Sequence, residues 1–328
     1  GPYTFEEVVV PAFAHNPQVR ALPDGTFVLF FIGGWPEQAC HCMYPTDNTS
    51  CPAQNTSGLS PMPPASWPGT AGRNCTVQNW THAACSPTMP GPSHDVCGPN
   101  LNGGCGLAVV TAASLAGPWS EPTAIVIDDQ WEAEDNIYCA HTNPSPLILP
   151  NGTILLAFNA GSCGGGEMIG VAVSHSSWKG PWRLLNKRSI FPGRSVVSGN
   201  GHAAEDPFLW KTTRGYHMLL HNFAQLPGGA NSMSAYGYSV DGVSWTLSPT
   251  PPYNCTVTFT DGTAIDVRRG CERPQLALVL PSDLDSDPLP IGLFTGGESS
   301  RTHTKPGPGP LPGVPPSGCY TVFRPILP

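Results

Sequence analysis

The sequence predicts an all-β fold, and three observations favour a β-propeller within that class. Helical periodicity is almost absent from the 328 residues, whereas short runs of β-branched and aromatic residues recur between turns. A motif of polar residues and a proline precedes four of these segments. Its later copies lie 63 and 67 residues apart, a period that suits radial blades of about four strands each.

The predicted strands are short and are separated by turns that contain glycine and proline. The chain has 37 glycines and 39 prolines, and they are spread between apolar runs, so they indicate turns rather than disorder. Asp-Gly and Asn-Gly pairs suit tight hairpins, because such turns need positive φ angles. We expect strands at 26–32, 107–112, 153–158, 169–174, 216–221, 256–260 and 291–295.

The proline motif defines the repeat. Its copies are His15-Asn16-Pro17, Asn143-Pro144-Ser145, Glu205-Asp206-Pro207 and Glu272-Arg273-Pro274. The first two copies lie 127 residues apart, twice the later period, and the excess is rich in cysteine and proline. We therefore expect one propeller domain over 1–328, with a disulfide-rich, glycosylated insertion at 36–104 within the first blade. The repeat count gives four blades.

A second motif follows within each repeat and ends in tryptophan. It reads Ser-x-x-Gly-Pro-Trp at 114–119 and at 177–182, and Ser-x-Asp-Gly-x-x-Trp at 239–245. We expect a turn before the last strand of each blade, and we expect the tryptophan to pack between neighbouring sheets.

The cysteines indicate an oxidising compartment. There are 12, an even number, so six disulfides are the simplest interpretation. We expect local pairs between Cys139 and Cys163 and between Cys271 and Cys319, although spacing alone leaves other pairings open. A zinc site at Cys40-His41-Cys42 is the alternative for the close-spaced cysteines.

Six Asn-x-Ser/Thr sequons point to a secreted or cell-surface glycoprotein. A further segment, 305–317, is rich in proline and glycine and is expected to be an extended loop. Its alternatives are hydroxyproline glycosylation or a contact with another subunit. The sequons begin at Asn48, Asn55, Asn74, Asn79, Asn151 and Asn254.

Charge and hydropathy exclude several partners. Charged residues make up 12% of the chain, the net charge is −8, and lysine and arginine form no cluster. Nucleic acid is therefore not an expected partner, because phosphate binding needs clustered cations. The apolar runs are shorter than the roughly 20 residues of a membrane span, so membrane insertion is not expected either.

The polar-Pro motifs together with the two tryptophan motifs resemble those of the five-bladed propeller glycosidases of the arabinanase, xylosidase and invertase type, and of their eukaryotic secreted relatives. The resemblance covers most of the chain outside the insertion. It implies five blades rather than four. It also implies a glycan in an axial funnel, where carboxylates at the starts of the blades act as base, pKa-tuning partner and acid.

The resemblance assigns these catalytic roles to particular residues. Asp206 matches the tuning carboxylate, Glu272 the acid, and Glu205 is a substitute acid. Asn16 stands at the position of the base, and an amide cannot take a proton from water at neutral pH. Activity as an inverting hydrolase therefore requires a base from elsewhere, with Asp135 or Glu134 as alternatives.

Other polar residues near the blade starts are expected to bind the glycan. The alternative roles are structural: Asp206 bonds backbone at a strand start, and Glu272 pairs with Arg273 to brace the sheet. No cofactor is expected; the alternative is an axial metal ion held by His15, His141 and His202. His217 and His221 are expected to pack in the sheet. The candidate binding residues are His15, Asn16, His141, Asn143, His202 and Arg273.

Two functions follow from these patterns. The first is an extracellular carbohydrate-active propeller that binds a glycan and hydrolyses it through Asp206 and Glu272. The second is a non-catalytic glycan-binding or structural subunit of a wall, sheath or filament, which assembles through the insertion or the proline-rich loop. The amide at Asn16 favours the second, and the carboxylates before Pro207 and Pro274 favour the first.

Overall fold

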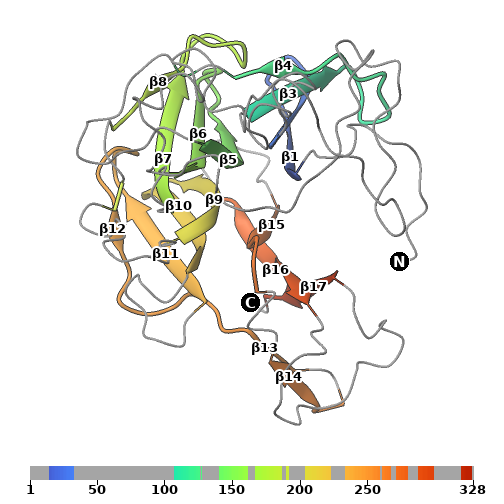
Figure 1. The fold of residues 1–328 in the computed structure, drawn as a ribbon, viewed down its shortest axis with the longest axis vertical. Coiled ribbons are helices and arrows are strands. Elements are labelled where there is room, and N and C mark those ends of the chain that lie inside the picture. Colours follow the sequence, from blue (N-terminus) through green and yellow to red (C-terminus); the bar gives the residue numbers. More distant parts are fainter. Residues whose placement is uncertain are drawn as a thin grey trace, which may run out of the picture. The chain divides into compact units, whose positions relative to one another are not determined.

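The computed structural model shows an all-β chain (Figure 1). Among the residues that it describes, none belongs to a helix that could span a membrane. The insertion at 36–104 and the loop at 305–317 lie outside the described residues. The described residues are 15–32, 107–125, 127, 140–161, 167–186, 190–191, 204–222, 233–258, 261–266, 271–279, 287–298 and 319–326.

The strands form successive antiparallel sheets in which chain neighbours pair. The first sheet has the order β1-β2-β3-β4 and the second β5-β6-β7-β8; the third has the order β12-β11-β10-β9, and the last β15-β16-β17. A two-stranded ribbon, β13-β14, lies between the last two in sequence. The bounds are β1 His15–Ala21, β2 Phe27–Ile32, β3 Leu107–Ala112, β4 Thr123–Ala124, β5 Ala140–Ile148, β6 Ile154–Gly161, β7 Glu167–Ser174, β8 Arg183–Leu184, β9 Ala204–Thr212, β10 Gly215–Asn222, β11 Ser234–Ser239, β12 Thr246–Leu247, β13 Thr256–Thr258, β14 Ala264–Asp266, β15 Gln275–Val279, β16 Leu289–Glu298 and β17 Cys319–Pro325.

This succession of meander sheets is the blade topology of a β-propeller and confirms the predicted fold class. Within the described part of the chain, four such sheets occur, three of four strands and one of three. The structure therefore agrees with the four blades of the repeat count. A fifth blade, which the resemblance implies, is not among the described residues.

The chain divides into two compact units. Unit 1 comprises residues 1–155, 160–164 and 173–184, and unit 2 comprises 156–159, 165–172 and 185–328. In unit 1, Phe31, Ala108 and Val110 form a buried cluster against which Trp119 packs. In unit 2, a buried cluster of Phe208, Leu219 and Leu293 is covered by Trp210, Tyr236 and Tyr253, among others.

Repeated turn sequences fold into repeated turns. The Leu22 amide donates to the Thr26 carbonyl at 2.8 Å, and the Thr26 amide donates to Asp24 Oδ1 at 2.9 Å. In the second sheet the same two bonds occur at Leu149 and Thr153, with Asn151 in the place of Asp24. A short acceptor side chain before a positive-φ glycine therefore fixes both hairpins.

The third tryptophan motif forms a turn that is held together by hydrogen bonds to Asp241. Its Oδ1 accepts the amides of Val243 and Ser244, each at 2.8 Å, and the Ser239 hydroxyl at 2.9 Å. The Trp245 indole then donates to the Gly242 carbonyl at 3.0 Å. These backbone bonds hold the pKa of Asp241 below its ordinary value.

The structure corrects one disulfide prediction. Cys271 is bonded to Cys255, with Cα atoms 5.6 Å apart, and not to Cys319. The β13-β14 ribbon reverses the chain between Cys255 and Cys271, which brings the two ends of the ribbon within bonding distance. Cys319 instead lies opposite Glu298 where β17 pairs with β16. The predicted partners Cys139 and Cys163 lie outside the described residues.

Candidate functional site

Four residues that precede a proline share an unusual backbone conformation, and we call them the pre-proline positions: Asn16, Asn143, Asp206 and Arg273. Their φ angles are 48°, 50°, 53° and 53°, the only positive values among non-glycine residues of the described part. Asparagine and aspartate tolerate this left-handed region better than other side chains, whereas arginine does not. Such strain persists only where surrounding structure enforces it, and it is concentrated at functional positions.

In β1 and β9, the proline that follows the pre-proline position is accommodated by a β-bulge on an edge strand. In β1, His15 pairs with Ile32 and Gln18 with Phe30, so the register shifts by one residue across Asn16 and Pro17. In β9, Glu205 pairs with His221 and Phe208 with Leu219, which gives the same shift. Proline has no amide to donate, so a bulge on an edge strand is a place where it leaves no ladder bond unmade. The bulge also redirects the side chain before the proline.

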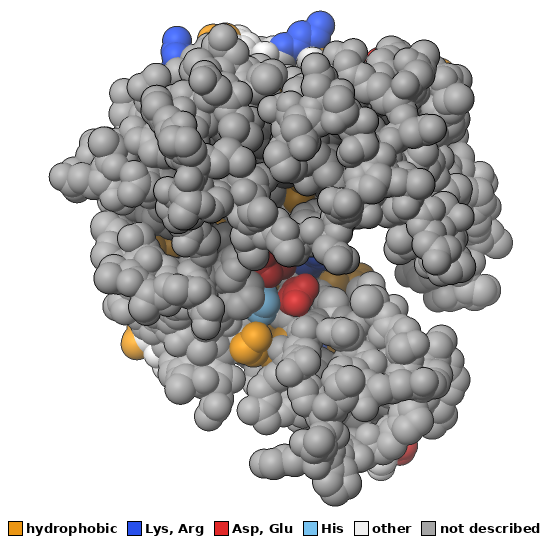
Figure 2. Space-filling view, in the orientation of Figure 1, with side chains coloured by type: hydrophobic (Ala, Val, Ile, Leu, Met, Phe, Trp, Pro, Cys, Tyr) orange, Lys and Arg blue, Asp and Glu red, His pale blue; other side chains and the backbone are white. Residues whose placement is uncertain are grey.

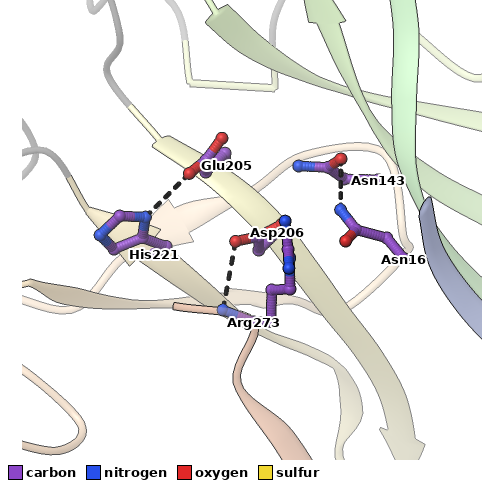
Figure 3. Close-up of polar contacts among 6 residues, drawn as sticks. All are labelled: Asn16, Asn143, Glu205, Asp206, His221 and Arg273. Atoms are coloured by element: carbon purple, nitrogen blue, oxygen red, sulfur yellow. Dashed lines mark hydrogen bonds and ion pairs between the residues drawn. The ribbon is translucent and has the colours of Figure 1, made fainter. Parts of the chain in front are cut away.

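In unit 1 the pre-proline positions are two amides bonded to each other. Asn16 Nδ2 donates to Asn143 Oδ1 at 2.5 Å (Figure 3). Arg20 Nε donates to the Pro146 carbonyl at 3.0 Å and so joins β1 to β5. Burial lowers the pKa of His141 to about 4, which keeps its ring neutral at pH 7. In β1, His15 lies opposite Ile32 of β2.

In unit 2 a side-chain contact joins neighbouring strands beside the third pre-proline position. Glu205 Oε1 lies 3.0 Å from Nδ1 of His221, and the two residues are direct partners across β9 and β10 (Figure 3). The His221 side chain is 2% exposed, whereas that of Glu205 is 20% exposed. One partner is therefore anchored in the core while the other reaches the surface.

Asp206 is buried beside these residues and is tied to the fourth pre-proline position. Its Oδ2 accepts the Arg273 amide at 3.1 Å, and its Oδ1 lies 3.8 Å from Arg273 Nε (Figure 3). Only 5% of Asp206 is exposed. Burial, and then the charge of Glu205, raises the pKa of Asp206 to about 7, against the opposing effect of Arg273.

Glu272 brings a third carboxylate to this part of unit 2. Its carbonyl accepts the Gly296 amide at 2.8 Å, which holds this residue to β16. One carboxylate oxygen each from Glu205 and Glu272 and one ring nitrogen of His221 all lie within 4.8 Å of one another. We call these three residues the His-Glu cluster. Figure 2 shows acidic side chains and a histidine together at the molecular surface.

The histidine and aromatic side chains on the neighbouring strands of unit 2 belong to the core. His217 stacks on the Trp210 ring with centroids 5.0 Å apart and contacts the Tyr236 hydroxyl at 2.6 Å, as expected for sheet packing. Trp210 packs in the unit 2 cluster with Phe208. Tyr253 also covers that cluster, and burial, followed by the charge of Asp206, raises the pKa of its hydroxyl.

The structure thus gathers Glu205, Asp206, Glu272 and Arg273 in unit 2, and it joins Asn16 to Asn143 in unit 1. His202 lies outside the described residues. Sequence reasoning missed the role of His221, which it assigned to packing alone. The signal was present, because a hairpin at Thr212–Gly215 with one extra residue at Asp206-Pro207 places Glu205 opposite His221.

Two of the predicted glycosylation positions are described and both are exposed. Asn151 lies in the β5-β6 turn, and Asn254 precedes β13, where its Oδ1 accepts the Thr256 amide at 3.0 Å. Asn48, Asn55, Asn74 and Asn79 lie outside the described residues.

Comparisons with known proteins are limited to solved structures, since no family model and no curated protein sequence matches the chain. Xylan β-1,4-xylosidase from Bacillus halodurans is 14% identical, with a TM-score of 0.43 over 95% of this chain. A GH43 protein of the xyloglucan locus of Bacteroides ovatus is 13% identical, with a TM-score of 0.42 over 96% of this chain. This chain spans about two fifths of the length of those proteins, 41% and 40%. A GH43 β-xylosidase/α-arabinofuranosidase from a compost metagenome is 13% identical, with a TM-score of 0.46 over 97% of this chain and 76% of that one.

Proposed function

We propose that this protein is a secreted glycoprotein that binds a glycan through Arg273 and the carboxylates of unit 2, without hydrolysing it by an inverting mechanism. The observation that carries this proposal is the amide pair of Asn16 and Asn143. Their 2.5 Å hydrogen bond occupies the place where the resemblance requires a catalytic base. Amide groups donate to and accept from sugar hydroxyls, but they do not deprotonate water.

The carboxylates of unit 2 do not replace the missing base. An inverting pair stands roughly 6.5–9.5 Å apart, because a water molecule must fit between one carboxylate and the sugar. Oxygen atoms of Glu205 and Glu272 lie within 4.8 Å of each other, which is too close for that arrangement. These carboxylates can accept hydrogen bonds from sugar hydroxyls. The side chain of Arg273 is 54% exposed, and its guanidinium adds N–H donors beside them.

One observation favours hydrolysis as a second candidate. Burial raises the pKa of Asp206 to about 7, so this carboxyl retains a proton close to neutral pH beside Glu272. A carboxyl group whose pKa lies near the operating pH suits general acid–base catalysis. In this candidate, Glu272 protonates the glycosidic oxygen, Glu205 is its substitute, and the base comes from outside the described residues.

Secretion is the remaining part of the proposal. The Cys255–Cys271 disulfide and the exposed sequons at Asn151 and Asn254 support an oxidising, glycosylating route. Assembly into an extracellular structure through the insertion or the proline-rich loop is a further expectation, which light scattering of the purified protein would test.

The deciding experiment measures binding and sugar release on the same panel of plant, algal and fungal polysaccharides. The panel is applied to the oxidised protein, to Arg273→Ala and Glu272→Gln, and to the surface control Glu121→Gln. We expect binding without release, binding weakened by Arg273→Ala, and no effect of Glu121→Gln. Release of sugar that Glu272→Gln abolishes would instead establish the hydrolase. Absence of binding throughout would overturn the proposal.

The variant Asn16→Asp sharpens this result. Aspartate adopts the same backbone conformation at position 206, where φ is 53°, so the exchange should not disturb the fold. It restores a carboxylate at the position of the base. Hydrolysis gained by Asn16→Asp, on a glycan that the parent only binds, would show that the amide is what stops the reaction.

A further inference from the structure

The three members of the His-Glu cluster have donor atoms suited to a metal ion. Glu205 and Glu272 each offer a carboxylate oxygen and His221 a ring nitrogen, all within 4.8 Å of one another. They come from two parts of the chain: Glu205 and His221 are partners in the β9-β10 hairpin, whereas Glu272 lies before the fourth pre-proline position and beyond the β13-β14 ribbon. The arrangement is therefore a product of the fold and not of a local sequence motif.

We propose that Glu205, His221 and Glu272 form a binding site for a divalent first-row transition ion such as Zn²⁺. An imidazole nitrogen with two carboxylates is a donor set that suits zinc and its neighbours. Calcium is a poorer fit, because it selects oxygen ligands and 6–8 of them, whereas this cluster contains a nitrogen. Three protein ligands leave at least one coordination position of the ion open to water or to another ligand.

The distances require only a small adjustment. Ligand bonds of about 2.0–2.2 Å in a tetrahedral site place donor atoms roughly 3.4 Å apart. Glu205 Oε1 and His221 Nδ1 are already 3.0 Å apart. A contraction of about 1 Å by the Glu272 carboxylate, which lies on a partly exposed side chain with three rotatable bonds, brings the third donor into range.

Burial divides the site into a fixed part and an adaptable part. The His221 side chain is 2% exposed and is held in the centre of unit 2 by β10. Glu205 is 20% exposed, so an ion reaches the cluster from the Glu205 side without opening the core. A ligand whose ring orientation is set by packing loses little conformational freedom on binding, which favours affinity.

The open coordination position gives the ion a function. A protein with three ligands on zinc keeps the fourth position for water or substrate. An ion in this cluster would therefore present an exchangeable water at the surface of unit 2. Sugar hydroxyls are oxygen ligands, so a glycan bound nearby would exchange with that water. The site itself does not depend on the proposed glycan function, because the ion binds to protein atoms alone.

The test is a zinc titration of the full, oxidised chain after chelator treatment and dialysis. Isothermal titration calorimetry and metal analysis after equilibrium dialysis give affinity and stoichiometry, without any glycan present. We expect the parent to bind one Zn²⁺. The affinity for this ion should fall at least about tenfold, or binding should be lost, in each of His221→Ala, Glu205→Gln and Glu272→Gln. The controls His175→Ala and Glu121→Gln change exposed residues of the same types and should bind as the parent does.

Two further comparisons make the outcome decisive. Calcium in place of zinc should bind much more weakly, because of the imidazole donor. If His221→Ala fails to fold, Glu272→Gln still reports on the site from its surface side. Zinc binding that survives all three cluster substitutions, or no zinc binding at all, would overturn the proposal. Glycan binding to the chelator-treated protein is read separately, so its failure would not be mistaken for the failure of the metal site.

Discussion

Replacement of Asp206 by asparagine should stabilise the protein at neutral pH, although Asp206 is central to the candidate site. The side chain is buried, and burial raises its pKa from 3.8 to about 7. A folded pKa above the unfolded one means that the fold disfavours the charged carboxylate. The contribution of Asp206 to stability is therefore fully present below pH 3.8 and is lost as the pH rises through about 7.

The magnitude follows from the two pKa values. A folded pKa of about 7 against 3.8 corresponds to about 4 kcal/mol of the free energy of unfolding, at about 1.4 kcal/mol for each tenfold change. Asparagine has no charge to bury, and its Oδ1 still accepts the Arg273 amide. The lost contact with Arg273 Nε, at 3.8 Å and on a 54% exposed side chain, is worth only about 0–1 kcal/mol.

The assay is urea unfolding of parent and Asp206→Asn between pH 4 and 8, with a chelator present throughout. The difference in unfolding free energy should grow with pH in favour of the variant and level off above about pH 7. At about 2.1 cal/mol/K for each of 328 residues, the full difference is roughly 6 °C in melting temperature. Asp241→Asn is the control, because the pKa of Asp241 is lowered, and its effect should be flat over pH 5–8. A constant difference, or a variant less stable than the parent at pH 8, would refute the reasoning.

Three further predictions test local features. Asn151→Asp should remove one glycan from the secreted protein, seen by intact mass, with stability within about 0.5 kcal/mol of the parent, since Asp24 makes the same turn bond. Asp241→Ala removes the acceptor of three hydrogen bonds and should lower the free energy of unfolding by about 1 kcal/mol in urea titrations. Gly215→Ala should lower it by about 2 kcal/mol or more, because φ is +142° and the added Cβ would stand 2.5 Å from the Ser239 carbonyl oxygen; an unchanged melting temperature would contradict this.

The sequence predicted the sheets better than it predicted their contacts. Alternating apolar runs and turn residues place strands well, because those patterns depend on neighbours along the chain. The predicted Cys271–Cys319 bond was wrong, because the partner of Cys271 depends on how the β13-β14 ribbon reverses the chain, which spacing does not reveal. The carboxylate partner of His221 is set by a one-residue bulge 15 residues earlier in the chain, which Asp206-Pro207 signals but the apolar pattern of the strands does not.

The four pre-proline positions share a backbone conformation but differ in side-chain chemistry. All four adopt the same left-handed conformation, and in β1 and β9 the same bulge surrounds it. Because this backbone is shared, the chemistry of each position depends on the residue that fills it. Two of them are amides that bond each other, one is a buried carboxylate, and one is an arginine, which tolerates a φ of 53° worst of the four. Asparagine would relieve that strain without loss of the fold, as Asn16 and Asn143 show. The presence of arginine beside Asp206 is therefore better explained by the charge that it brings to the carboxylates of unit 2 than by the stability of the strand.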